Sequence, residues 1–190
     1  MPILKKEPDI YPDDLLENKK LLSDPDRRWW SIYTLVRREK DLMRKLRSKS
    51  ISFYAPMISK RYRSAAGRIR TSYIPLFANY VFMFGNESDR YEAMTTNCVA
   101  KYSIVKEHEQ LVEDLRRIRT IINADIPLTP EANLSGGDPC RIKSGPFRDY
   151  EGIVIRRGGK TCFLISVRLL EQSISMEIDE GLLELSLIHI

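Results

Sequence analysis

Residues 123–137 read NADIPLTPEANLSGG and divide the chain into two parts with different hydrophobic patterns. The segment has two prolines, two glycines and no hydrophobic period, which predicts a linker. Before it, strand-like apolar runs alternate with helix-like stretches, as in a mixed sheet with helices packed on it. After it, the apolar runs are short and strand-like. The sequence therefore predicts an α+β protein with two domains.

The first domain is expected at residues 28–122, with the order β-α-β-β-α-β-α. Its sheet is predicted to be mixed and mainly antiparallel. The expected strands are 29–36, 52–59, 71–84 and 101–105, and the expected helices are 38–50, 88–100 and 107–122. Residues 1–27 contain four prolines among mixed charges, which predicts an N-terminal extension that is poorly ordered or only partly docked.

The second domain is expected at residues 136–185, after a linker at 123–135 and before a tail at 186–190. Strands are predicted at 139–143, 150–157, 160–170 and 173–179. Gly158 and Gly159 form a two-residue hairpin signal, because glycine reaches positive φ without steric cost. About fifty residues of short antiparallel strands predict a small closed β-barrel, since closure removes exposed edges.

Positive charge is concentrated in residues 37–70, which hold twelve Lys or Arg against two acids. That segment carries +10, so the remainder carries −5 of the total of +5. A basic patch of this kind predicts binding to nucleic acid or another acidic surface. Lys60, Arg61, Arg63, Arg68 and Arg70 lie on both sides of a Ser-Ala-Ala-Gly turn and form two basic arms.

Residue usage argues against an enzyme, a metal site and a membrane protein. The chain has two histidines and no His-x-x-x-His, Cys-x-x-Cys or nucleophile-elbow pattern, and His108 is expected to be solvated. Cys98, Cys140 and Cys162 are widely spaced, which predicts reduced, mostly buried thiols. No apolar run is long enough to span a bilayer, and the first residues carry charges. The sequence predicts a cytoplasmic binding protein with no cofactor and no membrane partner.

Two groups of residues resemble the NusG-type transcription elongation and antitermination factors. The stretch 137–159, GDPCRIKSGPFRDYEGIVIRRGG, is similar to the KOW motif. The first domain resembles the NGN domain through Trp29-Trp30, Tyr33, Glu39, APMI at 55–58 and PLFANYVFMF at 75–84. The chain looks most like the specialised RfaH-like or UpxY-like branch. The resemblance implies an NGN domain followed by a small SH3-like KOW β-barrel.

The resemblance also implies a docking site on RNA polymerase. In the family, an apolar depression on the NGN sheet receives the clamp helices of the β′ subunit, and the matching positions here are Tyr33, Phe77, Tyr80 and Phe82. Large rigid aromatic side chains are enriched at interface hot spots, which agrees with this role. Strand alternation puts Tyr80 and Phe82 on one face and Val81 and Met83 on the other.

Further partners implied by the resemblance are the β gate loop and upstream or non-template DNA, the latter contacted by the basic arms. The KOW partner loop corresponds to Phe147, Leu169, Leu170, Glu171 and Gln172. A ribosomal protein is one candidate partner of this loop. Rho is not expected, because Glu171-Gln172 stands where general NusG has Gly-Arg. The alternative function is an RNA- or ribosome-associated KOW protein that acts through its basic patch alone and does not need the four rings exposed together.

Overall fold

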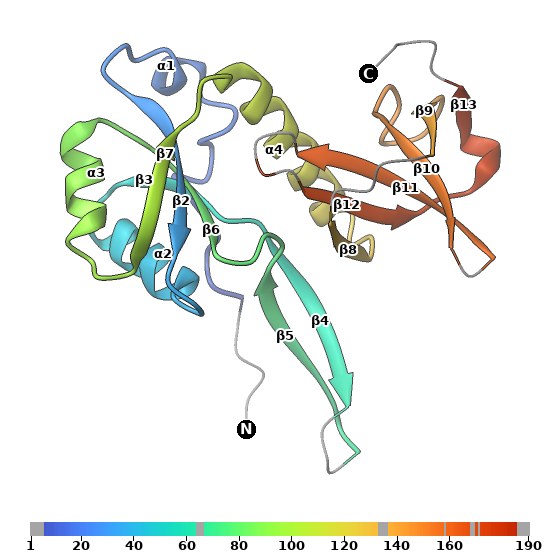
Figure 1. The fold of residues 1–190 in the computed structure, drawn as a ribbon, viewed down its shortest axis with the longest axis horizontal. Helices are drawn as coiled ribbons and strands as arrows, with labels where there is room; N and C mark the ends of the chain where they lie inside the picture. The colour runs from blue at the N-terminus through green and yellow to red at the C-terminus, as the bar shows by residue number, and fades with distance from the viewer. Residues whose placement is uncertain are drawn as a thin grey trace. The chain divides into compact units, whose positions relative to one another are not determined.

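The computed structural model describes residues 6–63, 67–132, 137–157, 159–167, 170 and 172–185. The chain divides into two compact units, Met1–Val112 and Glu113–Ile190. Unit 1 is an α+β structure and unit 2 is dominated by antiparallel strands (Figure 1). Helix α4 (His108–Asn123) begins in unit 1 and ends in unit 2.

Unit 1 is built on a five-stranded antiparallel sheet with the order β1-β3-β6-β2-β7. The strands are β1 (Ile10–Tyr11), β3 (Ser52–Tyr54), β6 (Tyr80–Gly85), β2 (Arg28–Thr34) and β7 (Val99–Ile104). Helix α1 (Lys19–Leu22) precedes β2, and α2 (Glu39–Ser48) and α3 (Glu87–Met94) follow β2 and β6. The antiparallel pairing predicted to dominate this sheet is confirmed, and among the described residues every strand pair is antiparallel, so the parallel pair of a mixed sheet is not seen.

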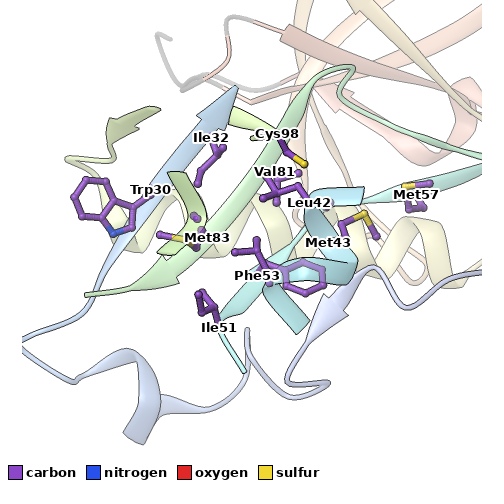
Figure 2. Packing of buried hydrophobic residues seen from close by; sticks show 13 residues of the cluster. Trp30, Ile32, Leu42, Met43, Ile51, Phe53, Met57, Val81, Met83 and Cys98 are labelled. Carbon is purple, nitrogen blue, oxygen red and sulfur yellow. The ribbon is translucent and has the colours of Figure 1, made fainter. Parts of the chain in front are cut away.

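One face of the sheet packs against α2. The buried cluster joins Leu42, Met43 and Leu46 of the helix to side chains of β2, β3 and β6 (Figure 2). Val81 and Met83 lie in this cluster, so the predicted alternation along β6 is confirmed. The helix side chains repeat at spacings of three and four and form one apolar stripe, which explains why α2 lies flat on the sheet.

The N-terminal extension is part of the fold in its described residues. Strand β1 pairs with β3, and the Ala55 N–H donates to the carbonyl of Asp9 at 2.8 Å. Ile10, Leu15 and Leu16 are buried. Of the two alternatives expected for this segment, poor order is wrong for residues 6–27, because a strand pairing and three buried apolar side chains hold them in the fold. Partial docking agrees with α1, which has no buried residue.

The expected strands 52–59 and 71–84 are each divided in two. Ala55 and Pro56 separate β3 from β4 (Met57–Arg63), and residues 76–79 separate β5 (Ile69–Pro75) from β6. The predicted breaks at Pro75 and Asn79 are confirmed. β4 and β5 pair only with each other and form a separate two-stranded ribbon that extends from the body of unit 1 (Figure 1).

Unit 2 contains a six-stranded antiparallel sheet with the order β13-β9-β10-β11-β12-β8. The strands are β13 (Leu183–Leu185), β9 (Asp138–Ile142), β10 (Glu151–Arg157), β11 (Lys160–Val167), β12 (Gln172–Glu177) and β8 (Leu128–Ala132), and the 3-10 helix η2 (Glu180–Leu182) precedes β13. Arg157 pairs with Lys160, and Gly159 has φ +76°, so the predicted two-residue hairpin is confirmed.

The linker and the barrel differ from expectation. The segment 123–135 includes β8, which pairs with β12, and proline is compatible with such an edge strand. Among the described residues, the outer strands β13 and β8 do not pair with each other, so the closed barrel is not seen. The edge of β12 that does not face β11 pairs with β8, and not with the first strand of a closed barrel. The Arg117 guanidinium of α4 also lies 5.6 Å from the Tyr150 ring centroid, so unit 2 includes residues before 136.

Candidate functional site

A tight turn positions the start of β6. The Tyr80 N–H donates to the Phe77 carbonyl at 3.2 Å, and Asn79 adopts φ +65°. Asparagine tolerates this left-handed conformation better than most residues. The Asn79 N–H donates to the buried Glu39 carboxylate at 2.8 Å. The backbone carbonyl of Asn79 accepts from the Thr34 N–H at 2.7 Å. Glu39 therefore ties the first turn of α2 to the turn that presents Tyr80.

Three side chains lie next to one another across β6, β2 and β7. Tyr80 pairs in register with Tyr33, and Tyr33 pairs with Lys101. The two rings meet edge to face with centroids 5.1 Å apart. Lys101 Nζ lies 5.0 Å from the Tyr33 ring centroid, and Asn79 Nδ2 donates to Tyr33 Oη at 3.4 Å. Both rings are half-buried, so they form a partly exposed aromatic pair with a cation beside it.

The other two predicted docking residues are buried. Phe77 is 1% exposed and Phe82 is 0% exposed, and their rings meet edge to face at 6.3 Å. The four rings therefore form two pairs, of which only Tyr33 and Tyr80 reach the surface. Strand alternation identifies the face on which a side chain lies and carries no information on what covers that face.

Apolar surface continues beyond the aromatic pair. Leu35 and Val36 follow directly after β2 and are 47% and 77% exposed. They lie at the end of β2 that is paired with the start of β6, which is also where Tyr33 and Tyr80 stand. We call Tyr33, Leu35, Val36 and Tyr80 the apolar end of the sheet. Exposed apolar residues grouped in this way are typical of an interaction surface.

The β4–β5 ribbon carries the five predicted nucleic-acid residues. Lys60, Arg61 and Arg63 lie on β4, Arg70 lies on β5 and Arg68 directly precedes it. All five are exposed, and none forms an ion pair with a described residue. The two strands contain no acidic residue. The structure therefore brings these cations together on one projecting ribbon, where the described residues provide them with no ion-pair partner.

The family described as "Transcription termination factor nusG" matches residues 27–130. That match covers 104 of 190 residues, more than half of the chain. The chain belongs to the NusG family. The family consists of non-enzymatic transcription factors. No curated protein matches the chain.

Among solved structures, the MjSpt4:Spt5 complex in conformation B is similar to this NusG-family chain, with 17% identity over 85% of this chain and 99% of that chain and a TM-score of 0.29. In the part of the chain that the structure describes, no helix is long and apolar enough to cross a membrane.

The predicted partner loop of unit 2 is only partly described. Leu169 and Glu171 lie outside the described residues. Phe147 and Leu170 are buried, and the Phe147 ring packs against Tyr150 at 5.8 Å. Gln172 begins β12 and pairs with Val167 and Ala132. The described apolar members of this set thus belong to the packing of unit 2.

His108 has a structural role that sequence reasoning missed. Its Nδ1 accepts a hydrogen bond from the Trp29 N–H at 3.3 Å, beside the end of the β2–β7 pairing. The pKa of His108 lies below its ordinary value of 6.5, mainly because the imidazole is partly buried and secondly because the Arg28 charge is nearby. The expectation of a solvated side chain is wrong, because the imidazole is half-buried and accepts a hydrogen bond from Trp29. Trp29 and His108 are 79 residues apart in the sequence.

The cysteines agree with expectation. All three thiols are free, with Cys98 and Cys140 buried and Cys162 half-buried. The pKa of the Cys140 thiol is raised, mainly by burial and secondly by the nearby negative charge of Asp138. The Cys98 thiol donates a hydrogen bond to the Asp41 carboxylate at 3.3 Å. This hydrogen bond is the largest cause that lowers the pKa of Asp41, and the hydrogen bond from Lys45 is the second. These thiols are part of the packing of the fold.

Proposed function

We propose that this NusG-family chain is a transcription elongation and antitermination regulator of the specialised RfaH-like or UpxY-like branch. Unit 1 acts as the NGN domain and docks on the β′ clamp helices of RNA polymerase. The β4–β5 ribbon contacts upstream or non-template DNA. Unit 2 acts as a KOW domain that recruits a further partner.

The observation that carries the docking proposal is the Tyr33–Tyr80 pair at the apolar end of the sheet. Edge-to-face packing and the Asn79 hydrogen bond hold both rings before a partner arrives. Rigid aromatic side chains lose little conformational entropy on binding and are frequent hot spots. Leu35 and Val36 enlarge the apolar area, and Lys101 adds a cation for an acidic partner residue.

Phe77 and Phe82 support this surface from below. Because both are buried, they act by holding the turn and strand that carry Tyr80. The docking surface proposed for this chain is therefore narrower than the set of four rings expected from the sequence. It consists of Tyr33, Tyr80, Leu35 and Val36.

The effect on transcription follows from binding two parts of the elongation complex. A factor that contacts the clamp and the nucleic acid together has higher affinity for the closed, active state than for an opened, paused state. Such differential affinity shifts the population toward elongation. The β gate loop of the polymerase is a further candidate contact that extends the same mechanism.

The partner of unit 2 is proposed to differ from Rho. Glu171-Gln172 removes the arginine that the resemblance places in the family's partner loop, and an acid there disfavours a partner that binds a cation. A ribosomal protein is the candidate that this proposal retains.

The docking proposal is tested by the affinity of the full chain for a purified fragment containing the β′ clamp helices. Tyr33→Ala with Tyr80→Ala is expected to weaken binding by about 2 kcal/mol or more, the scale of hot-spot truncation. Tyr91→Ala is the matched control, because Tyr91 is an exposed tyrosine on α3 outside the apolar end of the sheet. Equal affinity of the folded double variant and the wild-type protein would exclude the dock.

A second candidate function, an RNA- or ribosome-associated protein, is favoured by the positive charge of the β4–β5 ribbon, which needs no aromatic dock. Affinity capture of the intact protein from its own cell extract separates the two. Polymerase subunits lost from the Tyr33/Tyr80 variant support the first function. Ribosomal components retained by that variant, without polymerase, support the second.

A further inference from the structure

Tyr62 stands among cations on one face of the β4–β5 ribbon. The register pairs Tyr62 with Arg70 and Lys60 with Ser72, and paired residues share a face of the ribbon. Lys60 and Tyr62 also share this face, because they are two residues apart on β4. Arg61, Arg63 and Ile69 lie on the opposite face. The ring therefore has a cation two residues before it and another directly across from it.

The ring of Tyr62 is available to a ligand. Its side chain is 46% exposed, and it has no ring or cation contact with a described residue. The ribbon is held to the body of unit 1 at its other end, where Met57 is buried in the core and Tyr73 packs against it. Tyr62 lies five residues beyond Met57, so anchoring of the ribbon does not need it.

We propose that the face formed by Lys60, Tyr62 and Arg70 binds an unpaired nucleic-acid strand, with one base stacked on the Tyr62 ring and phosphates next to the two cations. Phosphate contacts alone need no aromatic residue. Bases of a duplex are stacked on each other, whereas an unpaired strand exposes base faces that aromatic side chains bind without sequence preference. The inference rests on the nucleic-acid role proposed above for the ribbon and adds that the Tyr62 ring selects an unpaired strand over a duplex by stacking on one base.

The test measures binding of the full chain to three fluorescent oligonucleotides of one sequence: single-stranded DNA, single-stranded RNA and duplex DNA. Tyr62→Leu keeps an apolar side chain of strand type and removes the aromatic ring. It is expected to weaken binding to one or both single strands by about 5- to 150-fold, the range measured for loss of one stacked base. Duplex binding is expected to change by less than about twofold, because its phosphate contacts remain.

Two further variants complete the test. Tyr62→Phe keeps the ring and is expected to bind like the wild-type protein. Ile69→Ala changes an exposed apolar residue on the opposite face of the ribbon and is expected to leave both single-strand affinities unchanged. A single strand carrying 2-aminopurine reports stacking directly, through fluorescence quenching that Tyr62→Leu removes and Tyr62→Phe retains.

Several outcomes would overturn the inference. These are no single-strand binding by the wild-type protein at low salt, equal loss for single strand and duplex in Tyr62→Leu, or failure of Tyr62→Phe to bind. The affinity of each variant for the clamp-helix fragment is measured in parallel and is expected to stay unchanged. If Tyr62→Leu binds single strands like the wild-type protein while clamp binding is normal, this inference fails and the docking proposal stands. If the wild-type protein does not bind the clamp-helix fragment but Tyr62→Leu loses single-strand binding, the docking proposal fails and this inference stands.

Discussion

Replacing Phe82 by alanine separates a supporting role from a contact role. The ring is fully buried and packs edge to face on Phe77. Phe→Ala in a core costs about 3–5 kcal/mol through lost burial and the cavity left behind, and about 0.5–1.5 kcal/mol is typical for the aromatic pair alone. Domains are stable by about 5–15 kcal/mol, so Phe82→Ala is expected to remove a large share of the stability of unit 1.

Urea unfolding monitored by tryptophan fluorescence measures this loss. Trp29 and Trp30 are the two tryptophans of the chain, and both lie on β2, which pairs with the strand that carries Phe82. Phe82→Leu keeps apolar volume and is expected to cost less than Phe82→Ala. A folded Phe82→Ala protein of unchanged midpoint that fails to bind the clamp-helix fragment would refute the supporting role and make Phe82 a contact residue.

Three further outcomes are expected. Glu39→Ala leaves the Asn79 N–H without its acceptor and should destabilise unit 1 by about 1–3 kcal/mol in urea, whereas Glu39→Gln, which keeps an oxygen acceptor, should cost less. The pKa of His108 is lowered in the folded state, so the contribution of His108 to stability is present above pH 6.5 and declines as the pH falls from there through the folded-state pKa. His108→Gln should flatten this decline in the free energy of unfolding. An unchanged pH profile of stability in this variant would contradict the role assigned to His108. Neutralising the cations of the opposite ribbon face with Arg61→Gln and Arg63→Gln should reduce the salt dependence of duplex binding, and a loss of affinity that is the same at all salt concentrations would assign those arginines to structure.

The sequence predicts the sheet of unit 1 well, because its signals are local. Alternation along β6 assigns Val81 and Met83 to the core, and the helical spacing of Leu42, Met43 and Leu46 identifies the face of α2 that meets them. Pro56, Pro75 and Asn79 lie at strand boundaries: Pro56 directly precedes β4, Pro75 ends β5 and Asn79 directly precedes β6. Each of these features depends on neighbouring residues and on one periodicity.

The features that the sequence does not predict depend on distant pairings. Burial of Phe77 and Phe82 requires knowledge of what covers their side of the sheet. Docking of residues 6–27 depends on the pairing of β1 with β3, about forty residues later in the chain. β8 reads as a linker because its partner, β12, follows about forty residues further on. Single-sequence patterns carry no direct record of such pairings.

The central claim, docking through the apolar end of the sheet, is tested most directly by photocrosslinking within the elongation complex. A photoreactive phenylalanine analogue is placed at position 33 or 80, and position 150 in unit 2 serves as the control. The account predicts that positions 33 and 80 crosslink to the β′ clamp helices and that position 150 does not. Crosslinks from 33 and 80 that avoid the β′ subunit, in a complex that still contains the bound protein, would contradict it.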